Sequence, residues 1–391
     1  MEKLKVLHIA SFNGNIGDNA NHNGFRKRLI ETLNREIIFT NLEIREFYQS
    51  WNLRDFNSTE FINLCNNHDL VVIGGGNFFE LKWDYSHTGT TININEDTLN
   101  QIKTPILFNG VGCDIAKGAS QSAVEKFRIF MERVTNDKNI LVSVRNDGSF
   151  DTIRNLYGDS FNNKIFKVPD GAFFMKPKKY DFPEVKSGYK SIGINVASDM
   201  KEIRFNSEVK GSISYDDFVN GFALVLNELL QKYEEYQLIF FPHIYSDLSV
   251  INDLLEKIED KYRRIRVIVA PCLTGEGSED YIFGLYKECD LIMGMRFHSN
   301  VCAISQNIPT IALCSYKKIL DLYKEINLSD RVVEINKTGF EKCLSDKIES
   351  TFTNIDDIRN DYKKLNLIIY QESLKYYNAV KDWYNNKIYK Y

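Results

Sequence analysis

Short, almost continuously apolar runs alternate with amphipathic stretches along most of this chain. In the first half the runs are KVLHIA, EIIFTN, DLVVIGG, PILFNGV, ILVSVR and KIFKV. In the second half they are SIGINVA, QLIFFP, IRVIVA, DLIMGM and PTIALC, and helical patterns such as SAVEKFRIFMERV and FVNGFALVLNELLQKY lie between them. Strands that are apolar on both faces and alternate with helices indicate parallel sheets covered by helices on both sides. The predicted fold class is therefore α/β, with doubly wound parallel sheets.

The length of 391 residues exceeds one ordinary domain and predicts two. The segment 175–189, MKPKKYDFPEVKSGY, holds two of the seven prolines and little apolar periodicity, which is typical of a linker. We therefore expect an N-terminal domain over 1–178 and a C-terminal domain over 179–350 that face each other across a cleft. The remainder, 351–391, is rich in Tyr, Asn and Lys and predicts a helical tail that packs across both domains.

Composition excludes several classes of protein. A net charge of −4 argues against a broad nucleic-acid footprint, and 43% hydrophobic residues supply a large core. The seven cysteines form no CxxC pair, so neither a zinc site nor a disulfide framework is predicted. The N-terminus runs directly into a strand, and no segment has 18 consecutive apolar residues. We expect a cytoplasmic protein that needs no metal and no cofactor.

Polar and glycine-rich turns follow several of the predicted strands. Ligands of such folds bind where the carboxyl ends of parallel strands open into a crevice, so these turns are candidate binding loops. SFNGNIGDNA contains Gly17 and Asp18, and it can form either a plain strand–helix turn or a phosphate- or hydroxyl-binding loop. GGGNFFE contributes Gly75, Gly76 and Asn77, where the glycines let a ligand approach the backbone closely.

Two further strand ends carry a cation or a titratable ring. Arg145 ends ILVSVR, where it can pair with Asp147 or present its guanidinium to a carboxylate or phosphate. His243 follows QLIFFP and is a candidate for contacting substrate, although a lone histidine is more often structural.

The stretch MGMRFHS sets Arg296, His298 and Ser299 directly after an apolar run. A buried strand that leads into a helix would direct a permanent cation, an imidazole and free backbone N–H groups at one point. Lys318 follows the next strand, and adjacent parallel strands would bring it beside His298, unless it belongs only to a solvated lysine pair. With Arg145 entering from the facing domain, we expect three basic groups to surround a small ligand that carries both carboxylate and phosphate.

In order along the chain, GNIGDNA, VVIGGGNFF, GVG, SVRNDGS, VPDGAFF and GMRFHSNVCAISQNIPTIAL resemble the polysaccharide pyruvyl transferase family. The resemblance implies a fold similar to GT-B glycosyltransferases, with two Rossmann-like domains. It also implies phosphoenolpyruvate as donor and, as acceptor, a sugar of a cell-surface glycan, free or lipid-linked. A lipid-linked acceptor would bring the protein to the inner face of the membrane. Family donor-binding roles fall on Arg145, His298 and Lys318, and Arg296 matches the arginine of the signature.

The implied reaction is the formation of a pyruvate ketal on two sugar hydroxyls with release of phosphate. His298 would supply or relay a proton, and Asp18 and His243 are both candidates for the base that activates the acceptor. The set of expected substrate-binding residues is Arg145, Arg296, Lys318, Gly17, Gly75, Gly76, Asn77 and Ser299.

The chain departs from the family pattern at four positions. Phe297 replaces leucine, Asn307 replaces glycine, Ser299 stands where alanine is common, and Ser315 stands where the family has tyrosine. These positions affect pocket shape, so they bear on the acceptor more than on the donor and leave room for an altered reaction.

Two other functions fit the sequence. A nucleotide-sugar glycosyltransferase could share the fold, and Glu341 and Glu349 have the Glu-x7-Glu spacing of retaining enzymes, although they lie in a late helix pattern. A degenerate relative could bind a glycan or an anion without turnover. Measuring phosphate release from phosphoenolpyruvate and nucleotide release from sugar nucleotides distinguishes the pyruvyl transferase, the glycosyltransferase and the non-catalytic relative.

Overall fold

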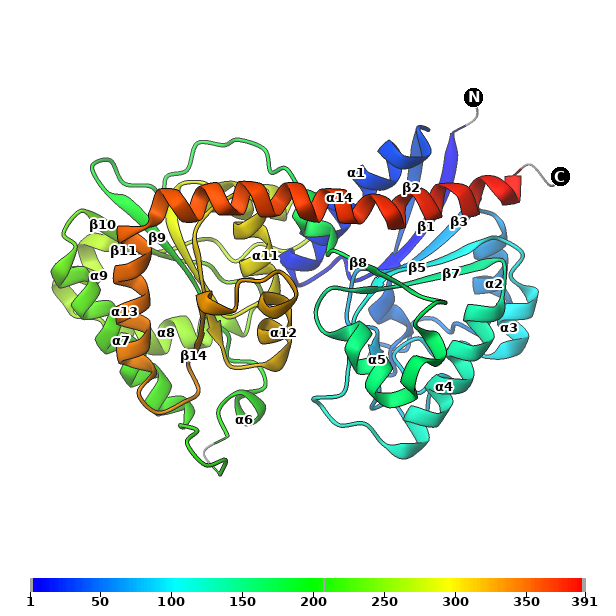
Figure 1. Ribbon diagram of the computed structural model, residues 1–391, viewed down its shortest axis with the longest axis horizontal. Coiled ribbons are helices and arrows are strands. Elements are labelled where there is room, and N and C mark those ends of the chain that lie inside the picture. Colours follow the sequence, from blue (N-terminus) through cyan, green and yellow to red (C-terminus); the bar gives the residue numbers. More distant parts are fainter. Residues whose placement is uncertain (1–2, 207, 389–391) are drawn as a thin grey trace. The chain divides into compact units, whose positions relative to one another are not determined.

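The computed structural model of the chain describes residues 3–206 and 208–388. They form two compact α/β units, each built on a six-stranded parallel sheet (Figure 1). Unit 1 comprises the residues up to Phe12, Asn21–Phe174 and the chain from Ile369 on. Unit 2 comprises Asn13–Ala20 and Met175–Ile368, so the turn after the first strand belongs to the second unit.

The strands arise from the apolar runs seen in the sequence. Each predicted run contains a strand, and most of these strands are buried along their length, as expected for parallel sheets with two covered faces. Three short strands, β4, β6 and β14, were not predicted, because two or three residues carry no periodicity. The strands are β1 (Leu4–Ala10), β2 (Ile37–Glu43), β3 (Leu70–Gly74), β4 (Phe79–Glu80), β5 (Ile106–Val111), β6 (Cys113–Asp114), β7 (Ile140–Arg145), β8 (Phe166–Val168), β9 (Lys190–Asn195), β10 (Tyr236–Phe240), β11 (Val267–Val269), β12 (Cys289–Gly294), β13 (Thr310–Cys314) and β14 (Val332–Glu334).

Helices connect the strands, and several begin at side-chain caps. Ser58, Ser120 and Ser214 each accept a backbone N–H of the first turn that follows them. The helices are α1 (Ile16–Leu33), α2 (Thr59–Asn66), α3 (Glu96–Gln101), α4 (Gln121–Asn136), α5 (Ser149–Tyr157), α6 (Lys201–Arg204), α7 (Tyr215–Lys232), α8 (Asp247–Lys257), α9 (Asp260–Arg266), α10 (Ser278–Tyr286), α11 (Phe297–Ser305), α12 (Lys317–Glu325), α13 (Phe340–Thr353) and α14 (Ile355–Ile388), with short 3-10 turns η1 (Ile44–Phe47), η2 (Gly158–Phe161), η3 (Gly171–Phe174) and η4 (Ser329–Arg331).

The strand order of each sheet shows where a ligand is expected. Unit 1 has the order β2-β1-β3-β5-β7-β8, and unit 2 has the order β11-β10-β9-β12-β13-β14. In doubly wound sheets, ligands bind at the carboxyl ends of the two strands between which the winding reverses. These switch points lie between β1 and β3 in unit 1 and between β9 and β12 in unit 2.

The predicted helical tail, 351–391, contains the last residues of α13 and the long helix α14. Up to Ile368, α14 belongs to unit 2, where the hydroxyls of Tyr362 and Thr310 are 2.7 Å apart. From Ile369 on it belongs to unit 1, where Tyr376 donates a hydrogen bond of 2.7 Å to the side-chain oxygen of Asn109. Both tyrosines are buried, so each part of the helix is anchored in its own unit.

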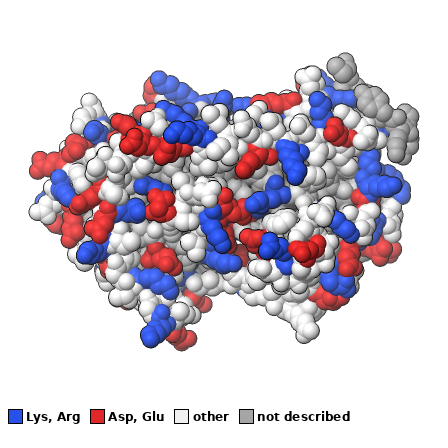
Figure 2. All heavy atoms as spheres, viewed as in Figure 1, with Lys and Arg blue, Asp and Glu red and all other residues white. Residues whose placement is uncertain are grey.

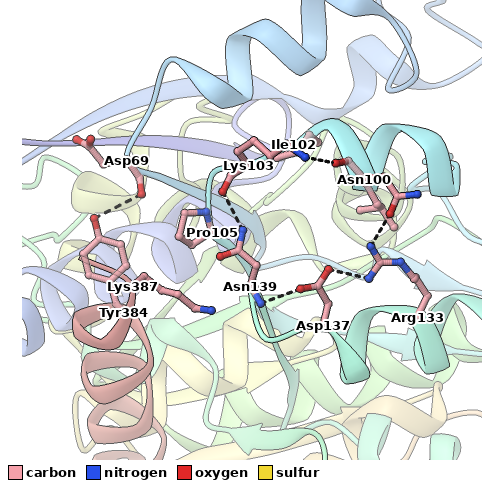
Figure 3. Close-up of a pocket in the computed structure, with 11 residues that line it drawn as sticks. Asp69, Asn100, Ile102, Lys103, Pro105, Arg133, Asp137, Asn139, Tyr384 and Lys387 are labelled. Carbon is pink, nitrogen blue, oxygen red and sulfur yellow. Dashed lines mark hydrogen bonds and ion pairs between the residues drawn. The ribbon is translucent and has the colours of Figure 1, made fainter. Parts of the chain in front are cut away.

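A pocket of about 750 Å³ opens at the amino edge of the unit 1 sheet (Figure 3). Asp69, Pro105 and Asn139, which line it, directly precede β3, β5 and β7. On the wall formed by α4, Arg133 is paired with Asp137 at 2.7 Å. The pocket lies at the edge opposite the strand carboxyl ends, and none of the predicted site residues lines it.

The distribution of charged side chains on the surface agrees with the small net charge of the sequence. On the face shown in Figure 2, basic and acidic side chains are interspersed over both units, and no field of one sign covers that face. Such a mixed surface is typical of a protein without an extended polyanion-binding site.

Candidate functional site

The turn from β12 to α11 lies at the switch point of unit 2. Asn195, the last residue of β9, accepts the backbone N–H of Met295 on its carbonyl at 2.9 Å. Its side-chain oxygen accepts the backbone N–H of Arg296 at 3.0 Å. These bonds fix the start of α11, so Arg296 and His298 lie at the strand end where this fold class binds ligands.

Two buried side chains hold the same turn from inside. The amide of Asn300 donates to the carbonyls of Gly294 and Arg296 at 3.0 and 2.8 Å. The hydroxyl of Ser299 donates to the Arg296 carbonyl at 2.7 Å, and both residues are fully buried. Ser299, which the sequence suggested as a substrate-binding residue, therefore shapes the turn with its hydroxyl.

Unit 2 also brings Asp18 to His298. Oδ1 of Asp18, in the first turn of α1, is 3.9 Å from Nδ1 of His298, an ion-pair distance when the ring is protonated. Gly17 makes this approach possible, because a Cβ at that position would lie 2.5 Å from the His298 ring. The side chains of Asp18 and His298 are 15% and 8% exposed, so both are largely shielded from water. A carboxylate beside an imidazole can orient the ring and stabilise its protonated form.

Arg296 is held in a network of opposite charges. Its Nε donates to Asp247 at 2.8 Å, and its terminal nitrogen contacts both Asp247 and Asp199, the latter at 2.7 Å. Arg204 lies 3.6 Å from Asp199 and also donates to the hydroxyl of Ser315 at 3.2 Å. Burial by itself would raise the pKa of Asp199, but the two guanidiniums hold it below its ordinary value. The departure at Ser315 thus gives Arg204 a partner.

His243 is placed differently from the expectation. Its ring is completely buried, with Nε2 2.9 Å from the hydroxyl of Tyr286, and its backbone N–H donates to Asp247. Burial, with smaller contributions from Arg296 and His298, lowers the pKa of His243 well below its usual range. A ring with no exposed surface has no face on which a sugar hydroxyl could bind. Of the two candidate bases, Asp18 is therefore better placed to take a proton from the sugar acceptor.

Lys318 lies on the first turn of α12, directly after β13. The strands β12 and β13 are adjacent and parallel, as the sequence predicted. In their register, Gly294 lies opposite Ala312. Their following helices α11 and α12 therefore begin at the same edge of the sheet. Lys318 is half-buried there, whereas the neighbouring Lys317 is exposed.

In unit 1, Arg145 is enclosed by two carboxylates. Its Nε donates to Asp147 at 2.9 Å and one terminal nitrogen donates to Asp170 at 3.1 Å. Both aspartate side chains are fully buried, and that of Arg145 is 5% exposed. Asp170 also accepts from the amide of Asn21 at 2.6 Å. Arg145 lies at the end of β7, as predicted. Its guanidinium, however, is buried within unit 1 and is not exposed to solvent.

The glycine-rich turn after β3 packs against this cluster. Gly75 has φ of +80°, which glycine adopts without strain, and a Cβ there would lie 2.7 Å from the ring of His22. The amide of Asn77 donates to Asp114 at 3.3 Å, and the carbonyl of Gly76 accepts the N–H of Gly112 at 2.8 Å. The loop is thus bound to the neighbouring turn after β5.

The sequence reasoning missed several polar residues of these clusters. Asn195 is the last residue of β9 and Asp199 lies in the turn beyond it, so polar residues at and after the end of a buried strand were the available signal. Arg204 in α6 and Asn21 within α1 carried no such signal, because only the tertiary fold brings them to their partners.

The described residues contain no group of three or more His, Cys, Asp or Glu side chains that could hold a metal ion. Within the same residues, no helix has the length and apolarity needed to cross a membrane. The Glu341 and Glu349 pair lies on α13, where Glu349 pairs with the exposed Lys232 on α7. These glutamates therefore do not lie after a strand, as a donor site would require.

Comparison with solved structures defines the class of protein first. A crystal structure of UDP-N-acetylglucosamine 2-epimerase superposes with a TM-score of 0.52 at 10% identity, covering 93% of this chain and 91% of that one. The enzyme from Neisseria meningitidis bound to UDP-GlcNAc gives 0.44 at 12% identity, covering 95% and 100%. Heptosyltransferase II from E. coli gives 0.47 at 10% identity, covering 90% and 100%. The fold is that of the GT-B class, with two Rossmann-like units.

The sequence then places the chain within that class. The profile of the polysaccharide pyruvyl transferase family matches residues 15–317, which include both the Arg145 and the His298 clusters. The chain therefore belongs to the polysaccharide pyruvyl transferase family and is a transferase that acts in polysaccharide biosynthesis, with a glycan as acceptor. No curated protein sequence matches it significantly.

Proposed function

We propose that this protein transfers the enolpyruvyl unit of phosphoenolpyruvate onto two hydroxyls of one sugar, forming a pyruvate ketal and releasing phosphate. The observation that carries the proposal is the pairing of Asp18 with His298 at the switch point of unit 2, in a chain of this family. The pair supplies a proton donor and a proton acceptor, which ketal formation requires.

The steps balance with these groups alone. His298 gives a proton to the methylene carbon of phosphoenolpyruvate, and one sugar hydroxyl adds to the neighbouring carbon while Asp18 takes its proton. The bond from that carbon to the phosphate oxygen then breaks, and the second hydroxyl adds in its place, its proton leaving with the phosphate. Transfer of the proton from Asp18 to His298 restores the pair, so one diol and one phosphoenolpyruvate give one ketal and one inorganic phosphate.

Cationic side chains would bind the donor. We assign the carboxylate and phosphate of the donor to Lys318 and Arg296 in unit 2. The guanidinium of Arg296 already faces two aspartates, so its orientation is fixed before a ligand binds. Such preorganised charge stabilises a leaving phosphate without reorganisation. A lipid-linked acceptor, if used, would place the reaction at a membrane surface.

The test is phosphate release from phosphoenolpyruvate in the presence of p-nitrophenyl glycosides of common hexoses and N-acetylhexosamines. The expected result is release that depends on one of these acceptors, with a product carrying a new methyl singlet in its proton spectrum. Nucleotide release from a UDP-sugar with no turnover of phosphoenolpyruvate would show a glycosyltransferase instead. Phosphoenolpyruvate binding without any turnover would show a non-catalytic relative.

A further inference from the structure

A group of aromatic side chains lies at the carboxyl edge of the unit 1 sheet, outside the clusters already described. Tyr48 and Trp51 follow η1 after β2, and Trp83 and Tyr85 follow β4. The rings of Tyr48 and Trp83 are 6.3 Å apart between centroids, and those of Trp83 and Tyr85 are 5.8 Å apart at 80°. The backbone N–H of Trp51 donates to the Tyr48 carbonyl at 3.0 Å, which places Trp51 in the same turn of the chain as Tyr48. We call these four residues the aromatic platform.

The platform is exposed in a way that core packing does not explain. Trp51 is 46% and Tyr85 is 40% exposed, whereas the aromatic rings of the unit 1 core, such as Phe79 and Phe127, are fully buried. Of the platform residues only Tyr48 packs against that core. Water-exposed rings at a ligand-binding edge, with Tyr85 packed on the ring of Trp83, are typical of a recognition surface.

Charged and polar groups border the rings. Glu80, itself 5% exposed, pairs with Lys117 at 2.6 Å and with Lys82 at 3.4 Å. Nζ of Lys82 lies 4.8 Å from the centre of the Trp83 ring. The indole nitrogen of Trp83 is itself buried and has no hydrogen-bond partner within the described structure. The apolar ring faces therefore stand beside an ammonium group and a carboxylate paired with it.

This combination matches the chemistry of a sugar. A pyranose presents one face of C–H groups, which packs on aromatic rings, and a rim of hydroxyls, which accept and donate hydrogen bonds. A nucleic acid is disfavoured by the mixed surface charge, and an apolar peptide would leave Glu80 and Lys82 without use. We propose that the aromatic platform binds a sugar ring of the acceptor glycan, which rests on the function proposed above.

The first test uses the three tryptophans of the chain, which give three indole N–H signals in a ¹⁵N–¹H spectrum. Trp51 and Trp83 belong to the platform. Trp383 donates to the carbonyl of Lys138, next to the amino edge of the same sheet, and serves as an internal control. The ligands are methyl glycosides of glucose, galactose, N-acetylglucosamine and N-acetylmannosamine, added without phosphoenolpyruvate.

We expect at least one glycoside to shift the Trp51 and Trp83 signals in a saturable manner while Trp383 stays in place. Signals that stay unmoved by every glycoside, or that move together with Trp383, overturn the proposal. Because no donor is present, the shifts report on the platform even when transfer fails. Shifts without phosphate release would thus reject the proposed reaction and keep the sugar site.

The second test measures acceptor kinetics in matched tyrosine variants. Tyr85→Ala should raise the KM for the acceptor roughly two- to tenfold with kcat and the KM for phosphoenolpyruvate unchanged, and Tyr85→Phe should restore it. Tyr180→Ala is the control, because Tyr180 is 37% exposed and also contacts two aromatic rings, those of Phe182 and Tyr281. An unchanged acceptor KM in Tyr85→Ala, or an equal rise in Tyr180→Ala, contradicts the platform.

Discussion

Both units place an arginine at the carboxyl end of a strand and hold it with two aspartates, but the two clusters differ in burial. Arg145 in unit 1 is 5% exposed, and its partners Asp147 and Asp170 are fully buried. Arg296 in unit 2 is 13% exposed; of its two partners, Asp247 is fully buried and Asp199 is 29% exposed. Both carboxylates are therefore enclosed in unit 1, whereas one of the two is closer to solvent in unit 2.

The two clusters also differ in what surrounds the arginine. In unit 1 the neighbours are hydrogen-bonding groups such as Asn21, which fix Asp170. In unit 2 the turn that begins with Arg296 carries His298, and Asp18 lies beside that ring. The comparison teaches that a strand-end arginine by itself does not define a reaction centre. A titratable pair next to it, as in unit 2, is the feature that supplies chemistry.

The largest effect is expected from removing the imidazole of unit 2. His298→Ala should reduce ketal formation about 10²–10⁴-fold, the usual contribution of a general acid or base. Asp18→Asn should also reduce the rate of ketal formation, because it removes the carboxylate beside the His298 ring. The measurement is phosphate release under saturating phosphoenolpyruvate, together with a thermal melt.

His68→Ala is the matched control, because that half-buried ring in unit 1 bonds Leu64 and Thr40 and lies outside the Arg145 and Arg296 clusters. Its turnover should equal that of the unchanged protein. A well-folded His298→Ala variant with normal turnover would place the chemistry elsewhere and remove the distinction between the two clusters.

The next effect concerns stability and separates the two arginines. Arg145→Met removes the guanidinium that pairs with two fully buried carboxylates, and breaking such a buried pair typically costs about 3–5 kcal/mol of unfolding free energy. Arg296→Met should cost less, about 1–3 kcal/mol, because Asp199 is partly exposed and keeps Arg204 as a partner. The buried Asp247 also loses its guanidinium, but it keeps the backbone N–H groups of His243 and Ile244. Urea denaturation of both variants tests the order, and equal losses would show that burial does not distinguish the clusters.

A smaller effect is expected on donor affinity in unit 2. Lys318→Ala should weaken phosphoenolpyruvate binding by about 1.5–3 kcal/mol, roughly ten- to a hundredfold, the contribution of one charge-assisted contact. Lys317→Ala is the control, because that neighbouring side chain is 70% exposed and pairs with Asp321. Calorimetric titration gives both affinities, and an equal loss in the two variants would mean only a general charge effect.

The smallest effect is a pH dependence that both units share. Burial is the largest cause that lowers the pKa of His8 in unit 1 and of His243 in unit 2 well below the ordinary value of 6.5. Each ring stays neutral when folded and takes up a proton when unfolded, so stability falls as pH drops below about 6.5. The expected slope is about 1.4 kcal/mol per pH unit for each histidine.

The slope is checked by measuring the unfolding free energy at several pH values between 5 and 7. His8→Gln and His243→Gln should each remove one histidine's share of the slope, whatever they do to the absolute stability. A slope that is unchanged in either variant would mean that the ring in that unit is protonated in the folded state.

Local patterns in the sequence predicted the strands and several site positions. Apolar runs indicated the parallel sheets, and the strand-end placement of Arg145, Arg296 and His298 followed from them. Asn307 shows the same local logic, since it has φ of +61° where the family has glycine, and asparagine tolerates that region better than most residues.

The sequence by itself determined the α/β class, the run of strands, and the family signature with its strand-end arginine and histidine, because these depend on periodicity and short spacings. Only the tertiary structure decided which groups meet. Asp18 reaches His298 from a turn that is distant in sequence, His243 is buried away from solvent, and Arg145 is enclosed by two carboxylates. Burial and long-range pairing depend on the packing of the whole unit, and no local pattern encodes them.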